Sequence, residues 1–203
     1  MSDCGCGAEQ ADQLERDTLT YLLAINGMMF VLEAVLGFIA QSTGLIADSL
    51  DMLADAAVYG ISLYVVGKGV IRQAKAAMVS GWLQIILGIG VLLDVVRRFI
   101  LGSDPQSAII MSVGLLALIA NVTCLMLISK HREGGVHMRA SWIFSTNDVI
   151  ANTGIIISGA LVWILGSRYP DLVIGAVIAT VIVRGGIKIL AEARAAGQEA
   201  FSA

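Results

Sequence analysis

The stretch Gly44–Gly60, GLIADSLDMLADAAVYG, places three carboxylates in an otherwise apolar segment: Asp48, Asp51 and Asp55. On a helix, residues four apart lie on one face, so Asp51 and Asp55 project together and Asp48 lies about one turn earlier. Ionised carboxylates this close repel each other, and each is costly to bury in an apolar environment. The stretch therefore predicts acids that are protonated, partnered by other groups or bound to a cation.

The composition of the whole chain is that of a membrane protein. Of its 203 residues, 57% are hydrophobic and 14% are charged, and the mean hydropathy is +0.83. A soluble domain carries about a quarter charged residues. The formal net charge of −3 provides no basic field for nucleic acid, which we exclude as a partner.

Six apolar segments have the length that a bilayer-spanning helix needs. The sequence therefore predicts an all-α, polytopic membrane protein, a bundle of six transmembrane helices with the lipid bilayer as its surroundings. The predicted spans are 19–41, 46–67, 76–100, 107–129, 140–165 and 171–190.

The charges in the loops predict the orientation, because cytoplasmic loops are enriched in Lys and Arg. With both termini cytoplasmic, nine Lys and Arg residues lie inside and three outside. We expect an acidic cytoplasmic tail over 1–18, a transport domain over 19–190 and a short, helical cytoplasmic tail over 191–203, in the cell inner (plasma) membrane. Cys4, Cys6 and Cys124 do not make a disulfide framework.

The fifth predicted span carries a second polar face. Asp148 and Asn152 are four residues apart and offer a carboxylate and an amide oxygen. Facing Asp51 and Asp55 across the bundle, they form a cluster of oxygen ligands suited to a divalent cation. The alternatives are that one aspartate is simply protonated and hydrogen-bonded, that Asp48 only supports the site, and that Asn152 joins helices.

Other polar residues have simpler interpretations. Glu33, alone on the first span, is expected to be a satisfied buried acid, with proton relay as the alternative, and Asp94 is expected to form a surface ion pair with Arg97 or Arg98. Two pairs are candidates for metal capture on the cytoplasmic side. They are the loop histidines His131 and His137, whose default interpretation is solvation, and Cys4 with Cys6, an incomplete metal site by themselves.

These features resemble the cation diffusion facilitator family. Its second span typically reads like ADAxHMLSD, and residues 47–55 of this chain read ADSLDMLAD. Asp51 thus matches the His-or-Asp ligand position and Asp55 the Asp that follows it. The family's fifth-span pattern, HxxxD with a V-x-x-N run, is matched in its second half by Asp148 and Asn152. The resemblance implies that Asp51, Asp55 and Asp148 bind metal.

The chain departs from the family in two respects. The fifth-span His falls at Phe144, which leaves the usual four-ligand site one ligand short. Ser145, Asn147, Asn152 or water are the candidate substitutes. The family also carries a cytoplasmic metal-binding domain after the sixth span, and this chain is expected to be a short form without it. A homodimer is then expected to form through the membrane helices.

The function that the resemblance implies is export of a divalent metal cation in exchange for protons, by alternating access. It makes the chain a secondary active transporter, not an enzyme, with metal as substrate and no cofactor. Zinc is ranked first only because of the resemblance. Manganese, iron, cobalt, nickel or cadmium are the alternatives, because losing the His favours oxygen ligation and weakens the argument for zinc. Two rival hypotheses are a metal-binding accessory protein that does not transport and an intramembrane aspartyl hydrolase using Asp55 and Asp148.

Overall fold

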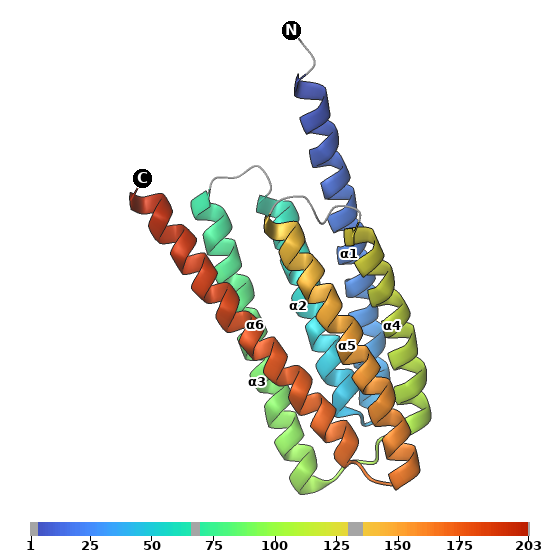
Figure 1. The fold of residues 1–203 in the computed structure, drawn as a ribbon. Helices are drawn as coiled ribbons and strands as arrows, with labels where there is room; N and C mark the ends of the chain where they lie inside the picture. The colour runs from blue at the N-terminus through green and yellow to red at the C-terminus, as the bar shows by residue number, and fades with distance from the viewer. Residues whose placement is uncertain (1–3, 66–69, 130–135, 203) are drawn as a thin grey trace.

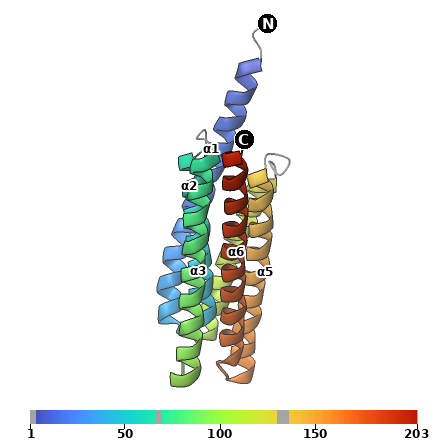
Figure 2. The ribbon, with the colours of Figure 1, turned by 90° about the vertical axis from the view of Figure 1, so that its left-hand side faces the viewer.

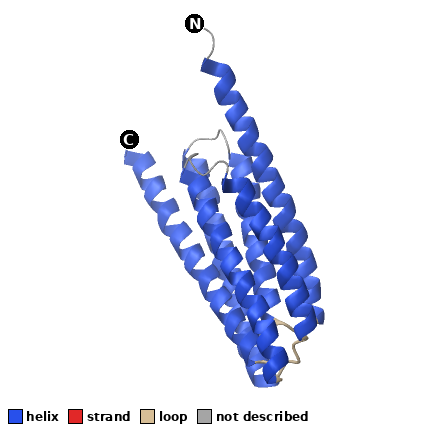
Figure 3. Ribbon diagram, turned by 45° about the vertical axis from the view of Figure 1, so that its right-hand side comes forward, coloured by secondary structure: helices blue, strands red, loops and turns tan. Residues whose placement is uncertain are grey.

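The computed structural model describes residues 4–65, 70–129 and 136–202, and these residues are all-helical apart from short connections (Figures 1 and 3). The fold-class prediction is therefore confirmed for the described part of the chain. The helices are α1 (Cys4–Ile39), α2 (Thr43–Val65), α3 (Val70–Leu101), α4 (Ser107–Ser129), α5 (Val136–Leu165) and α6 (Tyr169–Ser202).

The helices form a bundle with both ends of the chain at the same end (Figure 1). Helices α1, α2, α4 and α5 group together, whereas α3 and α6 pack mainly against each other and lean away from the group (Figures 1 and 2). Glycines permit the close α3–α6 contact, since a Cβ on Gly186 would come within 2.7 Å of the Gly81 carbonyl oxygen. Small residues play this role in membrane bundles.

Large apolar side chains cover the outside of the bundle. Phe38 is 75% exposed and Trp163 is 73% exposed, a surface that a soluble monomer does not carry but that suits lipid. Within the residues that the structure describes, five helices contain a segment long and apolar enough to cross a membrane. These segments are Arg16–Ile39, Ala77–Leu101, Ser107–Ser129, Asp148–Leu165 and Tyr169–Ala195. The chain is a multi-pass membrane protein.

The remaining predicted span, 46–67, corresponds to α2, which is not among those five segments. It has 23 residues, a sufficient length, but it carries Asp48, Asp51 and Asp55. That α2 crosses the membrane therefore stays a prediction. The helices also extend beyond the predicted spans: α1 begins at Cys4, inside the predicted tail 1–18, and α6 continues to Ser202 through the predicted tail 191–203.

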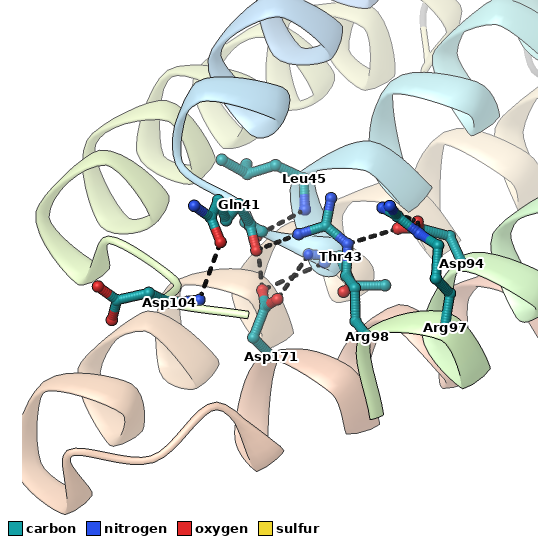
Figure 4. Close-up of polar contacts among 10 residues, drawn as sticks. Gln41, Thr43, Leu45, Asp94, Arg97, Arg98, Asp104 and Asp171 are labelled. Atoms are coloured by element: carbon teal, nitrogen blue, oxygen red, sulfur yellow. Dashed lines mark hydrogen bonds and ion pairs between the residues drawn. The ribbon is translucent and has the colours of Figure 1, made fainter. Parts of the chain in front are cut away.

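A polar network fixes the start of α2 at the end of the bundle opposite the termini (Figure 4). Asp171, at the start of α6, is fully buried. Its carboxylate accepts hydrogen bonds from the Ser42 hydroxyl (2.5 Å) and from the Thr43 and Gly44 N–H groups (2.5 and 3.2 Å). The Ser42 hydroxyl in turn accepts from the Leu45 N–H. An anion is favoured at a helix N-terminus, where N–H groups lack partners within the helix.

The same network fixes the turn between α1 and α2. Gln41 has a positive φ of 51°, a conformation that costs a non-glycine residue of order 1 kcal/mol. Its carbonyl oxygen accepts a hydrogen bond from the Arg98 guanidinium, and its side-chain oxygen accepts one from the Asp104 N–H at 3.1 Å. Asp94 binds both Arg97 and Arg98 at 2.6 Å (Figure 4). The predicted surface ion pair is confirmed for Asp94 and Arg97, whose side chain is 59% exposed. Arg98 is only 6% exposed, so the Asp94–Arg98 pair is partly buried.

We expect Asp171→Ala to lower the free energy of unfolding by about 2–4 kcal/mol, because three buried donors at the α2 N-terminus lose a charged acceptor. The measurement is an SDS unfolding titration of the detergent-solubilised protein. Asp104→Ala is the matched control, since the Asp104 side chain is exposed and we expect a change below about 0.5 kcal/mol. Equal destabilisation by the two substitutions would contradict the capping role.

Candidate metal centre

The acids of α2 point into the bundle to different degrees. Asp48 is 1% exposed and Asp55 is 8% exposed, whereas Asp51 is partly exposed. At a rise of 1.5 Å per residue, Asp55 lies about 18 Å along the helix from Thr43, well inside the bundle. The helix therefore carries its carboxylates to a depth where few polar groups are available to solvate them.

Helix α5 brings a fourth carboxyl group to this face. Asp148 is 8% exposed, and its carboxyl group lies beside that of Asp55, close enough for the two to share a proton. Asp51 and Asp48 interact electrostatically with both. A hydrogen bond between two carboxyl groups needs a proton on one of them. The Asp55–Asp148 pair can thus hold a proton in a place where a cation can replace it.

Asn152 adds a neutral oxygen beside this pair. It is fully buried, and its Nδ2 donates a hydrogen bond to the Asp148 carbonyl oxygen at 2.9 Å. Its Oδ1 has no hydrogen-bond partner among the described residues. A buried acceptor without a partner is costly, so this oxygen is available to a ligand.

The structure brings part of the predicted ligand set together. Asp55 and Asp148 meet, with Asp51 nearby and the unpartnered oxygen of Asn152 one turn from Asp148. Among the described residues, however, no three His, Cys, Asp or Glu side chains are already arranged to hold a metal ion. Binding a metal at this site therefore requires side-chain rotation, with Asp51 as the nearby third carboxylate.

Several predicted residues lie outside what the structure describes. The side chains of Phe144, Ser145 and Asn147 belong to α5 but fall outside the described set, as do those of Cys4, Cys6 and His137. His131 lies outside the described residues altogether. Their proposed roles as substitute ligands or in metal capture stay predictions.

Three further polar residues are buried on α1 and α4, two helices that pack against each other. Asn26 and Asn121 are 2% and 1% exposed, and Cys124 is a free, buried cysteine. Asn26 donates through Nδ2 to the Cys124 sulfur at 3.9 Å, while its Oδ1 has no hydrogen-bond partner among the described residues. The sequence alone does not predict the contact between Asn26 and Cys124, because it depends on how α1 packs against α4.

Asp171 is the structural residue that sequence reasoning missed. Its signal is weak, because an acid that follows a proline at a predicted span boundary is typical of an ordinary solvated loop. The Ser42-Thr43-Gly44 segment does carry the residue types of a helix N-cap. Nothing in the sequence, however, shows that the capping carboxylate comes from a helix more than a hundred residues away.

Residues 19–196 match the model of the cation efflux transmembrane domain. The chain belongs to the cation efflux family. It is 24% identical over 187 residues to the zinc transporter ZitB of Yersinia pseudotuberculosis, an alignment that covers 86% of this chain and 60% of the relative.

Other members of the family give a similar alignment. The cadmium, cobalt and zinc/H(+)-K(+) antiporter of Bacillus velezensis is 20% identical over 186 residues, covering 84% of this chain and 59% of the relative. The metal cation efflux system protein CzcD of Cupriavidus metallidurans is 22% identical over 174 residues, covering 79% and 55%. The chain spans at most about 60% of the length of these relatives.

Proposed function

We propose that this protein exports a divalent metal cation across the membrane in exchange for protons. The observation that carries the proposal is the buried Asp55–Asp148 carboxyl pair, which lies where α2 meets α5 and can share a proton. The names of the family members, which describe zinc transport and antiport of cadmium, cobalt and zinc, support the same class of substrate.

The proposed exchange follows from competition for the same oxygens. A dication bound by Asp51, Asp55 and Asp148 stabilises their ionised forms and displaces the proton of the pair. When the cation leaves, a proton must return, because adjacent ionised carboxylates repel in an apolar bundle. Rocking of one helix group against another would expose the site to each side of the membrane in turn.

The ligand set bears on the choice of metal. Zinc is ranked first because the relatives' names favour it, and the Oδ1 of Asn152 is proposed as the fourth ligand. Without an imidazole at position 144, the site offers mainly oxygen, which favours manganese or ferrous iron more than a nitrogen-containing site does. Cobalt, nickel and cadmium are further candidates.

The rest of the proposal concerns orientation. The Lys and Arg bias of the loops supports cytoplasmic termini, and the termini share one end of the bundle (Figure 1). We place the protein in the plasma membrane with α2 as a sixth span. A homodimer through membrane helices stays a prediction.

A second candidate function is a metal-binding accessory protein that does not transport. The observation that favours it is that the described acids are not preassembled into a group of three around one point. This candidate predicts that the wild-type protein in vesicles moves no protons when a metal gradient is applied.

Asp55→Asn is the sharpest test of the proposed exchange, because it keeps the shape of the side chain but removes its charge and its proton exchange. We expect metal uptake into proteoliposomes, and the accompanying pH change, to fall at least 100-fold. The readouts are a metal-sensitive dye and a pH-sensitive dye in the same vesicles. Glu192→Gln is the control, since Glu192 is exposed and forms a loose ion pair of 4.0 Å with the exposed Lys188. Undiminished flux in Asp55→Asn would refute the assignment.

Phe144→His tests whether the missing imidazole sets the metal preference. Position 144 lies four residues before Asp148 on α5, so the two positions share a helix face. We expect the zinc-to-manganese ratio of transport rates to rise about tenfold, because nitrogen ligation favours zinc. The measurement is a panel of single-metal flux assays, with Phe144→Leu as control. An equal rise in Phe144→Leu would show that ligation is not the cause.

A further inference from the structure

A second acidic pair lies between α1 and α2. The two helices form an antiparallel hairpin in which Gly37 lies so close to Leu45 and Ile46 that a Cβ added to it would lie 3.0–3.2 Å from their atoms. Moving one turn inward along α1 from Gly37 brings Glu33 opposite the next turn of α2. There the Glu33 carboxyl group meets that of Asp48.

Both members of this pair are buried without adequate partners. Glu33 is 0% exposed and Asp48 is 1% exposed. Neither Glu33 oxygen, nor Oδ2 of Asp48, has a hydrogen-bond partner of sound geometry among the described residues. Among the described residues, Glu33 has no partner other than the neighbouring Asp48 carboxyl group, so the expectation of a satisfied buried acid stays a prediction. Oxygens left in this state are costly to bury unless a proton or a cation compensates them.

No side-chain cation supplies this compensation in the described part of the chain. The ion pairs among the described residues join Arg97 and Arg98 to Asp94, and Lys188 to Glu192. Arg168 donates to the Phe99 carbonyl oxygen. The groups that face Glu33 and Asp48 electrostatically are instead further acids, with Asp51 acting on both.

The pair lies in line with the candidate metal centre. Glu33 is about 9 Å along α1 from its end at Ile39, and Asp48 is about 7 Å along α2 from Thr43. Asp51 and then Asp55 follow at successive turns of α2. Asp51 interacts electrostatically with Glu33 and with Asp55, so it lies between the two acidic pairs.

We propose that Glu33 and Asp48 form a second binding station for the transported divalent cation, between the Asp55–Asp148 centre and the bundle end where α1 meets α2. Asp51 is the ligand that the two stations share. The class of cation rests on the proposed function. The stations are about 10 Å apart along α2, where two dications repel strongly in an apolar bundle, so the cation occupies them in turn.

The test counts Mn²⁺ bound to the purified full-length chain, using the EPR signal of free Mn²⁺. Manganese is the probe because all-oxygen sites accept it. We expect Asp55→Asn/Asp148→Asn to retain one Mn²⁺ per chain, and the addition of Glu33→Gln and Asp48→Asn to weaken its binding at least tenfold. Glu192→Gln added to the first pair is the matched control and should leave binding unchanged.

Two results would overturn the second station: no Mn²⁺ binding by Asp55→Asn/Asp148→Asn, or binding that persists after Glu33 and Asp48 are both changed. Size-exclusion chromatography of each variant excludes misfolding as the cause of a loss.

As a second measurement, Glu33→Gln alone should slow proteoliposome flux at least tenfold while Mn²⁺ still binds at the Asp55–Asp148 centre. Unchanged flux would remove the pair from the transport path. Absence of wild-type flux with Mn²⁺ retained by Asp55→Asn/Asp148→Asn would refute the proposed function and leave the second station standing.

Discussion

The burial of carboxylates on α2 is the constraint on which the rest of the bundle depends. A helix that carries Asp48, Asp51 and Asp55 cannot face lipid with those residues, since no water is available there to solvate them. Helix α2 accordingly occupies the centre and contacts each of the other five helices. Its neighbours are then free to be almost entirely apolar on their outer faces, as Phe38 on α1 and Trp163 on α5 show.

The Thr43 end of α2 is held in place by polar groups from other helices. At the Thr43 end, Asp171 from α6 caps the helix, while Arg98 from α3 holds the turn that precedes it. Backbone groups of the α3–α4 connection also bond to this turn, as the Gln106 N–H does to the Ala40 carbonyl oxygen. The network closes the end of the bundle opposite the termini. Opening a path there must break charge-assisted hydrogen bonds, which are stronger than neutral ones.

Much of the fold could be predicted from the sequence because it depends on length and hydropathy, which are local properties. Five predicted spans correspond to segments able to cross a membrane, and the Asp94 ion pair follows from i,i+3 and i,i+4 spacing. The proximity of Asp55 and Asp148 needed more, namely the family pattern. The roles of Asp171 and Glu33 could not be predicted. Asp171 depends on a contact between helices that are distant in the chain, and Glu33 depends on the register of the α1–α2 hairpin.

The sharing of protons and cations is a property of the acidic cluster as a whole more than of any one residue. Glu33, Asp48, Asp51, Asp55 and Asp148 interact electrostatically along one path through α1, α2 and α5. Five carboxyl groups this close in an apolar bundle cannot all be ionised without positive charge among them. Protons and a metal ion are two ways of supplying that charge, so movement of one must change the occupancy of the other. This coupling depends on burial and spacing, and it therefore does not require the histidine that the family pattern places at position 144.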